Sequence, residues 1–182
     1  MGIQGILAGL LVGGPAHGYQ LKATLEEELG PVWMTSASQV YLTLGRMHRD
    51  GVVSSRRVRQ ERRPDRQLLA LTASGRALAL EWLFESDDPD ESVVRLAVAR
   101  LVVPDRFAEL TDIIVEQRSA ALTELRSLRR DATQGFQREA IDAEIQRVQA
   151  DLRWTVAVRE HAGAIVQRPR SGSRSDSSAR YG

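Results

Sequence analysis

Arginines are concentrated in one short stretch of this 182-residue chain, between residues 46 and 66. The stretch holds eight arginines against three acidic residues, a local charge of +5 in a chain whose overall formal charge is +1. The planar fork of the arginine guanidinium suits phosphate groups and guanine edges better than the lysine ammonium does. Because so many like charges repel one another, the cluster favours a polyanionic partner over an ordinary solvated surface.

The first part of this stretch is expected to lie on a helix with one small, basic face. At 100° per residue, Val40, Leu44 and Met47 share the buried side of that helix. The outward side then holds Ser38, Leu42, Gly45, Arg46 and Arg49. In isolation such a face is more often a solvated surface, but the basic residues that follow it favour nucleic acid.

A helix of this kind fits the major groove of DNA, which is about 12 Å wide. The guanidinium of Arg46 or Arg49 would then fork onto guanine or a phosphate, and Leu42 would touch a thymine methyl. Gly45 has no side chain, so it would let the helix backbone approach the DNA closely.

The start of the same helix offers four further DNA-binding candidates. Ser36 and Ser38 would donate to phosphate, which helix N-termini attract. Gln39 has two interpretations, because its amide would either read adenine or complete an S-x-x-Q capping box with Ser36. Tyr41 lies at the edge of the buried side, and both phosphate contact and simple packing remain open for it.

Four arginines around Pro64 complete the predicted DNA-binding set. A basic loop stiffened by proline suits the DNA backbone or a narrow minor groove. Contacts of this kind supply affinity but little sequence discrimination. These wing candidates are Arg57, Arg62, Arg63 and Arg66.

Several functional classes are excluded or disfavoured by what the chain lacks. It has no cysteine, which excludes disulfides, thiolate zinc sites and a cysteine nucleophile. Its three histidines, His17, His48 and His161, are far apart and not at metal-ligand spacing from carboxylates. No glycine-rich phosphate loop or nucleophile motif occurs, so we expect neither an enzyme nor a cofactor. Without a long apolar run or a basic leader, the chain is expected to be cytoplasmic.

The elements that position the basic residues follow from apolar spacing and breakers. Apolar residues recur at helical spacing over 3–11, 21–29 and 36–51, where glycines and prolines end each run. Strand-formers at 52–59 and 67–71 enclose a polar stretch, which predicts a two-stranded hairpin, and Thr72 caps a fourth helix. This is the winged helix-turn-helix order, assigned to residues 1–85. His17 and Tyr19 lie at the start of the second helix, where packing of its turn against the third helix is favoured over contact with DNA.

The remainder of the chain is predicted to be an all-helical dimerisation domain, so the fold class is mainly α with a small β-hairpin. Residues 86–91 are acidic, contain a proline and are assigned as a linker. Helices are expected within 92–166, and the Ser, Gly and Arg of 167–182 predict a disordered basic tail. A seam with steps of four and three favours helix packing, between subunits or within the chain against residues 110–128. The candidate dimerisation residues are Ile141, Ile145, Val148, Leu152 and Trp154.

Three segments of the chain resemble the PadR family of bacterial regulators. Residues 14–21, GPAHGYQL, are similar to the family's G-P-x-H-G-Y-x-L, and residues 40–53, VYLTLGRMHRDGVV, to L-Y-P-A-L-x-R-L-x-x-x-G-L-I. Residues 63–75, RPDRQLLALTASG, are similar to R-P-x-R-K-x-Y-x-L-T-x-x-G. Leu42 replaces the usual proline, and Gln67 and Leu69 replace a lysine and a tyrosine of the wing. The resemblance extends over most of residues 3–165.

The resemblance implies a repressor that binds double-stranded DNA as a homodimer and responds to a small aromatic effector. Two-fold pairing predicts an inverted-repeat operator with half-sites about one helical turn apart. Trp33 and Trp154 are candidates for lining an effector pocket, although buried tryptophans more often belong to the core. The alternative is a winged-helix module that binds another protein and no DNA.

Overall fold

The computed structural model describes residues 2–30, 33–58, 66–132 and 135–166; the side chains of residues 58, 66 and 162–166 are left out. The first half of the chain contains α1 (Ile3–Leu11), α2 (Gly18–Leu29), α3 (Ala37–Arg49) and α4 (Ala73–Phe84). Between α3 and α4, β2 (Val53–Val58) and β3 (Arg66–Leu71) form an antiparallel pair. This order confirms the predicted winged helix-turn-helix.

The sheet has three strands, one more than the sequence predicted. The two-residue strand β1 (Ala16–His17) pairs with β3, so the order is β1-β3-β2. A strand of two residues has no alternating pattern of its own. It exists because the turn between α1 and α2 returns against the outer edge of β3, where Ala16 lies opposite Leu69.

Helix α1 lies at the centre of the apolar core and packs closely against α4. A Cβ atom placed on Gly5 or Gly9 would come within 2.7 Å of the buried Trp82 ring. Since that distance is well inside van der Waals contact, the two glycines allow the close approach of α1 and α4. Ile6 and Leu7 on α1 are also fully buried, and the same apolar cluster continues through α5 (Ser92–Val102) to the beginning of α6.

Residues 86–91, the predicted linker, make hydrogen bonds to both neighbouring helices and include the short helix η1 (Pro89–Glu91). The Glu91 carboxylate accepts from Trp82 Nε1 at 2.7 Å and from the Ser86 hydroxyl at 3.1 Å. Burial alone would raise the pKa of Glu91, but its hydrogen bonds, including one from the Gly2 N–H, lower it. The fully buried Arg95 donates to the Leu83 carbonyl at 2.8 and 3.0 Å, and burial lowers its pKa to about 10.

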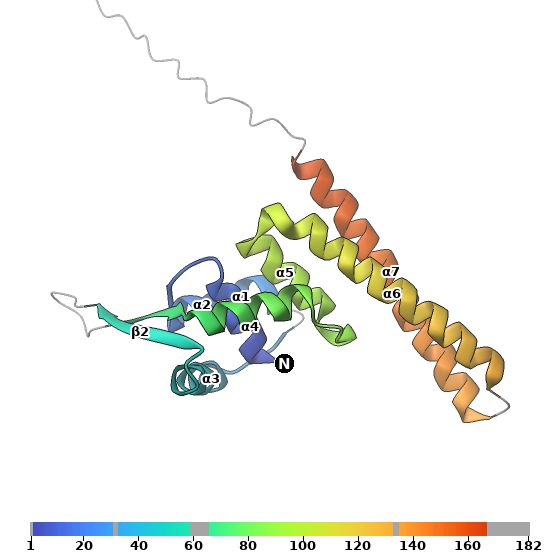
Figure 1. Cartoon of the computed structure of the whole chain (residues 1–182), viewed down its shortest axis with the longest axis horizontal. Helices are drawn as coiled ribbons and strands as arrows, with labels where there is room; N and C mark the ends of the chain where they lie inside the picture. The colour runs from blue at the N-terminus through green and yellow to red at the C-terminus, as the bar shows by residue number, and fades with distance from the viewer. Residues whose placement is uncertain (1, 31–32, 59–65, 133–134, 167–182) are drawn as a thin grey trace, which may run out of the picture.

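The second half of the chain forms a long antiparallel hairpin of two helices. After η2 (Pro104–Arg106), α6 (Phe107–Asp131) and α7 (Phe136–Val166) lie side by side and extend away from the winged body. Figure 1 shows the hairpin tip and the wing at opposite ends of the molecule. The predicted tail, residues 167–182, lies outside the described residues. In the described part of the chain, no helix is both long and apolar enough to cross a membrane.

Candidate nucleic-acid interface

Helix α3 buries one side and leaves the other open, as its sequence predicts. Val40, Leu44 and Met47 are buried in the core, whereas Leu42 is 64% exposed. Arg46 and Arg49 are exposed, and an added Cβ atom on Gly45 would meet nothing within 4 Å. The two arginines also lie in the last turn of α3, where cations interact favourably with the helix dipole.

The start of α3 forms one half of the expected capping box. Ser36 is the N-cap, and its hydroxyl accepts from the Gln39 backbone N–H at 3.2 Å. The Gln39 side chain accepts from the Thr35 hydroxyl at 3.2 Å rather than returning to Ser36. Tyr41 is 51% exposed, and Ser38 and Gln39 are also exposed. All seven α3 candidates therefore lie on one accessible surface.

Of the four wing candidates, the structure describes the side chain of Arg57 alone. Two residues that pair across β2 and β3 point to the same face of the sheet, and so do residues two positions apart on one strand. Arg57 pairs with Gln67, and Ser55 pairs with Leu69, so all four lie on one face. Leu69 is buried, so this face of the sheet turns toward α3. Arg62 and Arg63 lie outside the described residues, as does the side chain of Arg66 at the start of β3. Their role in DNA binding stays a prediction.

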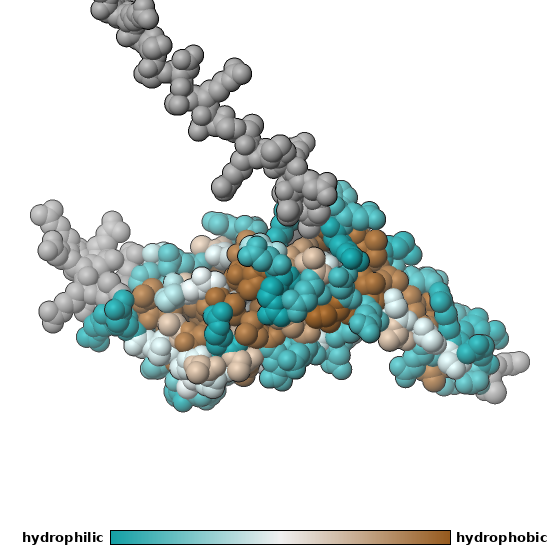
Figure 2. All heavy atoms as spheres, turned by 45° about the horizontal axis from the view of Figure 1, so that its top comes forward, coloured by the Kyte–Doolittle hydropathy of each residue, from teal (hydrophilic) through white to brown (hydrophobic). Residues whose placement is uncertain are grey.

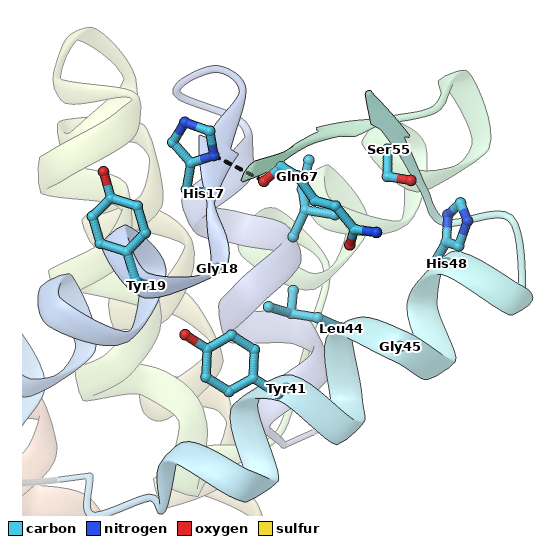
Figure 3. Close-up of a pocket in the computed structure, with 10 residues that line it drawn as sticks. His17, Gly18, Tyr19, Tyr41, Leu44, Gly45, His48, Ser55 and Gln67 are labelled. Carbon is cyan, nitrogen blue, oxygen red and sulfur yellow. Dashed lines mark hydrogen bonds between the residues drawn. The ribbon is translucent and has the colours of Figure 1, made fainter. Parts of the chain in front are cut away.

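A groove of about 560 Å³ opens between the start of α2, helix α3 and the sheet. Figure 3 shows side chains from all three elements converging on it. Two histidines, two tyrosines, a glutamine and a serine supply its polar lining, and no carboxylate of the described residues is among them. The lining residues with polar side chains are His17, Tyr19, Tyr41, His48, Ser55 and Gln67.

The amino-acid sequence does not reveal this groove as a unit. Packing was favoured for His17 and Tyr19, and the Nδ1 of His17 does tie the turn to β3 through the Gln67 carbonyl at 2.8 Å. Tyr19 stacks on His17 with ring centroids 5.5 Å apart, yet it remains half-exposed. On α3, Tyr41 and His48 are seven residues apart and therefore lie on the same side of the helix, a spacing that could have indicated one wall of the groove.

The predicted dimerisation seam lies largely against α6 within the same chain. Val148 is 2% exposed, so it has almost no surface left for a partner subunit. Ile141, Ile145 and Leu152 are half-buried in the hairpin, and Trp154 is 39% exposed. The intrachain alternative therefore accounts for part of this seam, and dimerisation itself stays a prediction.

The two candidate effector-binding tryptophans line different hollows. Trp33 borders a small one of about 170 Å³ beside the end of α2. Trp154 borders a larger hollow of about 440 Å³, together with residues of α2, α5 and α6. In the ranges that the structure describes, no three His, Asp or Glu side chains gather so that they could hold a metal ion.

Comparisons with known proteins relate part of the chain to transcriptional regulators. Residues 6–81 match the profile of the "Transcriptional regulator PadR-like family". Two curated relatives are the "Negative transcriptional regulator PadR" of Bacillus subtilis, 30% identical over 87 residues, and a "Probable transcriptional regulator" of Mycobacterium tuberculosis, 32% identical over 74 residues. These matches cover 48% and 41% of this chain, and 48% and 39% of the two relatives, so the chain spans less than half of either.

Among solved structures, the chain is similar to Bacillus subtilis PadR in complex with operator DNA. The identity is 20%, the TM-score is 0.44, and the match covers 89% of this chain and 99% of the other.

Proposed function

We propose that the chain is a PadR-like transcriptional regulator, the family whose profile residues 6–81 match, and that it acts by binding double-stranded DNA. The match groups it with regulators rather than enzymes. The observation that carries the proposal is the open face of α3, where Leu42, Arg46 and Arg49 are exposed and a Cβ atom added to Gly45 would meet nothing within 4 Å.

Helix α3 is the element that enters the major groove. Its buried side anchors it to the core, and its exposed side meets base edges through Leu42 and the two arginines. Arg57 on β2 lies on the sheet face that turns toward α3, where it reaches the neighbouring phosphates. The helix supplies most of the sequence discrimination, and the wing supplies most of the charge-driven affinity.

We expect the regulator to act as a dimer on an inverted repeat. One winged unit covers too little DNA for a specific site, whereas a two-fold pair presents two recognition helices about one helical turn apart. The hairpin tip carries exposed apolar side chains, with Phe136 82% and Leu128 49% exposed. Leu128 borders a hollow of about 470 Å³ on α6 and α7, which a second hairpin would fill.

The hollow beside Trp154 is the proposed effector pocket. It lies where α2 of the winged domain meets α5, α6 and α7, so a bound molecule would contact both halves of the protein. Its wall is mainly apolar, including Leu96, Phe107 and Val158, and one acidic and one basic side chain, Glu28 and Arg100, also line it. Figure 2 shows apolar surface gathered over the middle of this face, between the winged body and the hairpin. This mainly apolar environment suits a small aromatic compound.

Salt-dependent binding to a labelled duplex tests the proposal. We expect affinity for random DNA to fall steeply with salt, because the log-log slope is about −0.9 for each phosphate neutralised. The R46A/R49A double variant should bind much more weakly and show a shallower slope. The matched control is R126A/R130A, which removes two exposed arginines from α6. Wild-type protein that binds no duplex at low salt would contradict DNA binding and favour the protein-interaction module.

Protection mapping and a reporter then test the finer proposals. Footprinting of the upstream region of its own gene should protect two half-sites arranged as an inverted repeat. A reporter downstream of that site should be silenced when the regulator is present, as expected for repression. Activation of the reporter, or a single asymmetric protected site, would overturn these parts of the proposal.

A further inference from the structure

We infer that the hollow beside Trp154 selects a small aromatic zwitterion, that is, an aromatic ring whose side arm carries both an ammonium and a carboxylate group. Glu28 from α2 binds the ammonium, and Arg100 from α5 binds the carboxylate. The inference rests on the proposed function, because it names the class of compound that the proposed effector pocket accepts. It also requires that an aromatic acid without an ammonium group binds poorly.

The apolar part of the hollow provides a place for the aromatic ring. Leu96 on α5 and Phe107 on α6 are buried, and Val158 on α7 packs against the same core. The Trp154 indole is 39% exposed, so part of its ring remains open to a ligand. The volume of about 440 Å³ lies within the range of pockets that hold small molecules, and it leaves room for a ring with a short polar arm.

Two side chains of opposite charge line this hollow from different halves of the protein. Glu28 lies in the last turn of α2, and Arg100 lies in the last turn of α5. Among the residues that the structure describes, none forms an ion pair or a side-chain hydrogen bond with Glu28 or Arg100. By contrast, Glu26 on the same helix pairs with Lys22 at 2.5 Å. The carboxylate and the guanidinium that border the hollow are therefore both available to a ligand.

The presence of both charges decides which ligands the hollow accepts. Glu28 and Arg100 are not in direct contact with each other, and both are long, exposed side chains that can reach the polar end of a bound molecule. A ligand with a carboxylate alone would satisfy Arg100 but repel the Glu28 carboxylate, and a ligand with an ammonium alone would do the reverse. A zwitterion satisfies both side chains, as charge complementarity requires.

A ligand held by both charges would connect the two halves of the protein. Glu28 belongs to a helix of the winged domain, whereas Arg100 and Trp154 belong to the helical half. Because binding then depends on how these halves lie relative to each other, any change in their arrangement on DNA alters the affinity for the zwitterion. By thermodynamic linkage, the zwitterion alters the affinity for DNA by the same factor.

Titration calorimetry of the full chain with three matched probes tests the inference. Phenylalanine carries both charges, phenethylamine lacks the carboxylate, and hydrocinnamate lacks the ammonium. We expect wild-type protein to bind phenylalanine about tenfold more tightly than either of the other two. Glu28→Gln should abolish the preference for phenylalanine over hydrocinnamate, and Arg100→Gln should abolish the preference over phenethylamine.

Glu27→Gln and Arg153→Gln are the matched controls, because both residues are exposed neighbours of lining residues but do not line the hollow themselves. They should leave all three affinities unchanged. Hydrocinnamate that binds wild-type protein as tightly as phenylalanine, or preferences that persist in both test variants, would overturn the inference and leave an aromatic effector in place. Binding of none of the probes would overturn it as well. Titration of a duplex without any probe tests DNA binding separately.

Discussion

At the scale of single residues, Gly45 is the position where stability and function are expected to conflict. Glycine in the middle of a helix costs roughly 0.5–1 kcal/mol relative to alanine, and no atom near Gly45 requires the small residue. Since it lies between the exposed arginines and Tyr41 on α3, the conformational cost is explained if the helix backbone must approach DNA closely at this point.

Gly45→Ala should therefore raise the free energy of unfolding by about 0.5–1 kcal/mol and weaken DNA binding. Thermal unfolding and duplex titration measure the two effects on one preparation. Gly75→Ala is the contrasting variant, because its Cβ would lie 1.9 Å from the Val52 carbonyl oxygen and should destabilise the fold. Unchanged DNA affinity in Gly45→Ala would show that the backbone does not approach the duplex there.

Leu42 is a second residue of α3 with an expected role in DNA binding, because its apolar side chain is largely exposed to solvent. Leu42→Ala should change the free energy of unfolding by less than about 0.5 kcal/mol, because the side chain contributes little to the core. In the operator, replacement of the contacted thymine by uracil removes the methyl group and should weaken wild-type binding but not that of the variant. Equal losses for both proteins would exclude this contact.

At the scale of elements, Thr72 joins the end of α3, the sheet and the start of α4. Its hydroxyl accepts from the Gly75 N–H at 3.0 Å and donates to the Gly51 carbonyl at 2.6 Å. The first bond caps α4, and the second holds the turn at which α3 ends. This one side chain therefore helps to hold the wing in place relative to α3, beside the backbone hydrogen bonds from Val52 to Met47 and from Thr72 to Val52.

Thr72→Ala should lower the free energy of unfolding by about 1–2 kcal/mol, as expected for the loss of an N-cap. Thr72→Ser keeps the hydroxyl and should retain most of that stability. Chemical denaturation of the three proteins provides the comparison. An alanine variant as stable as wild type would mean that water replaces both bonds at no cost.

At the scale of the whole molecule, Glu91 connects α1, α4 and α5. It accepts hydrogen bonds from Gly2, Trp82 and Ser86, and it is almost fully buried at the junction between the winged body and the helical half. These bonds stabilise the carboxylate form, which is why the pKa of Glu91 is lowered although burial opposes the charge.

Glu91→Gln should destabilise the fold at neutral pH by about 1–3 kcal/mol, because buried donors lose a charged acceptor. A carboxyl whose pKa is lowered by folding stabilises the native state above its unfolded pKa, near 4.5, and loses that contribution as pH falls through the folded value. The gap between wild type and variant should therefore shrink on acidification below about pH 4.5. Glu81→Gln, an exposed change on α4, is the control, and a gap independent of pH would contradict the role of Glu91.

The subunit contact proposed at the tip of the α6–α7 hairpin also concerns the whole molecule. Phe136→Glu should shift the molar mass measured by light scattering from dimer toward monomer, since a charge would replace an exposed apolar side chain. Ala120→Glu, at an exposed site in the middle of α6, should leave the mass unchanged. A dimer that persists in the Phe136 variant would locate the subunit contact elsewhere.

The sequence by itself determined the helices of the winged domain, the N-caps of α3 and α4, and the open face of α3. Those features depend on residues within a few positions of one another, such as Ser36 with Gln39 and Thr72 with Gly75, so local spacing reveals them. Only the tertiary structure showed that strand β1 forms, that the groove exists, and that the apolar seam of α7 packs partly against α6 of the same chain. His17 meets the Gln67 carbonyl across 50 positions, and Val148 packs against another helix. Such contacts depend on how the whole core packs, and no local pattern of residues specifies them.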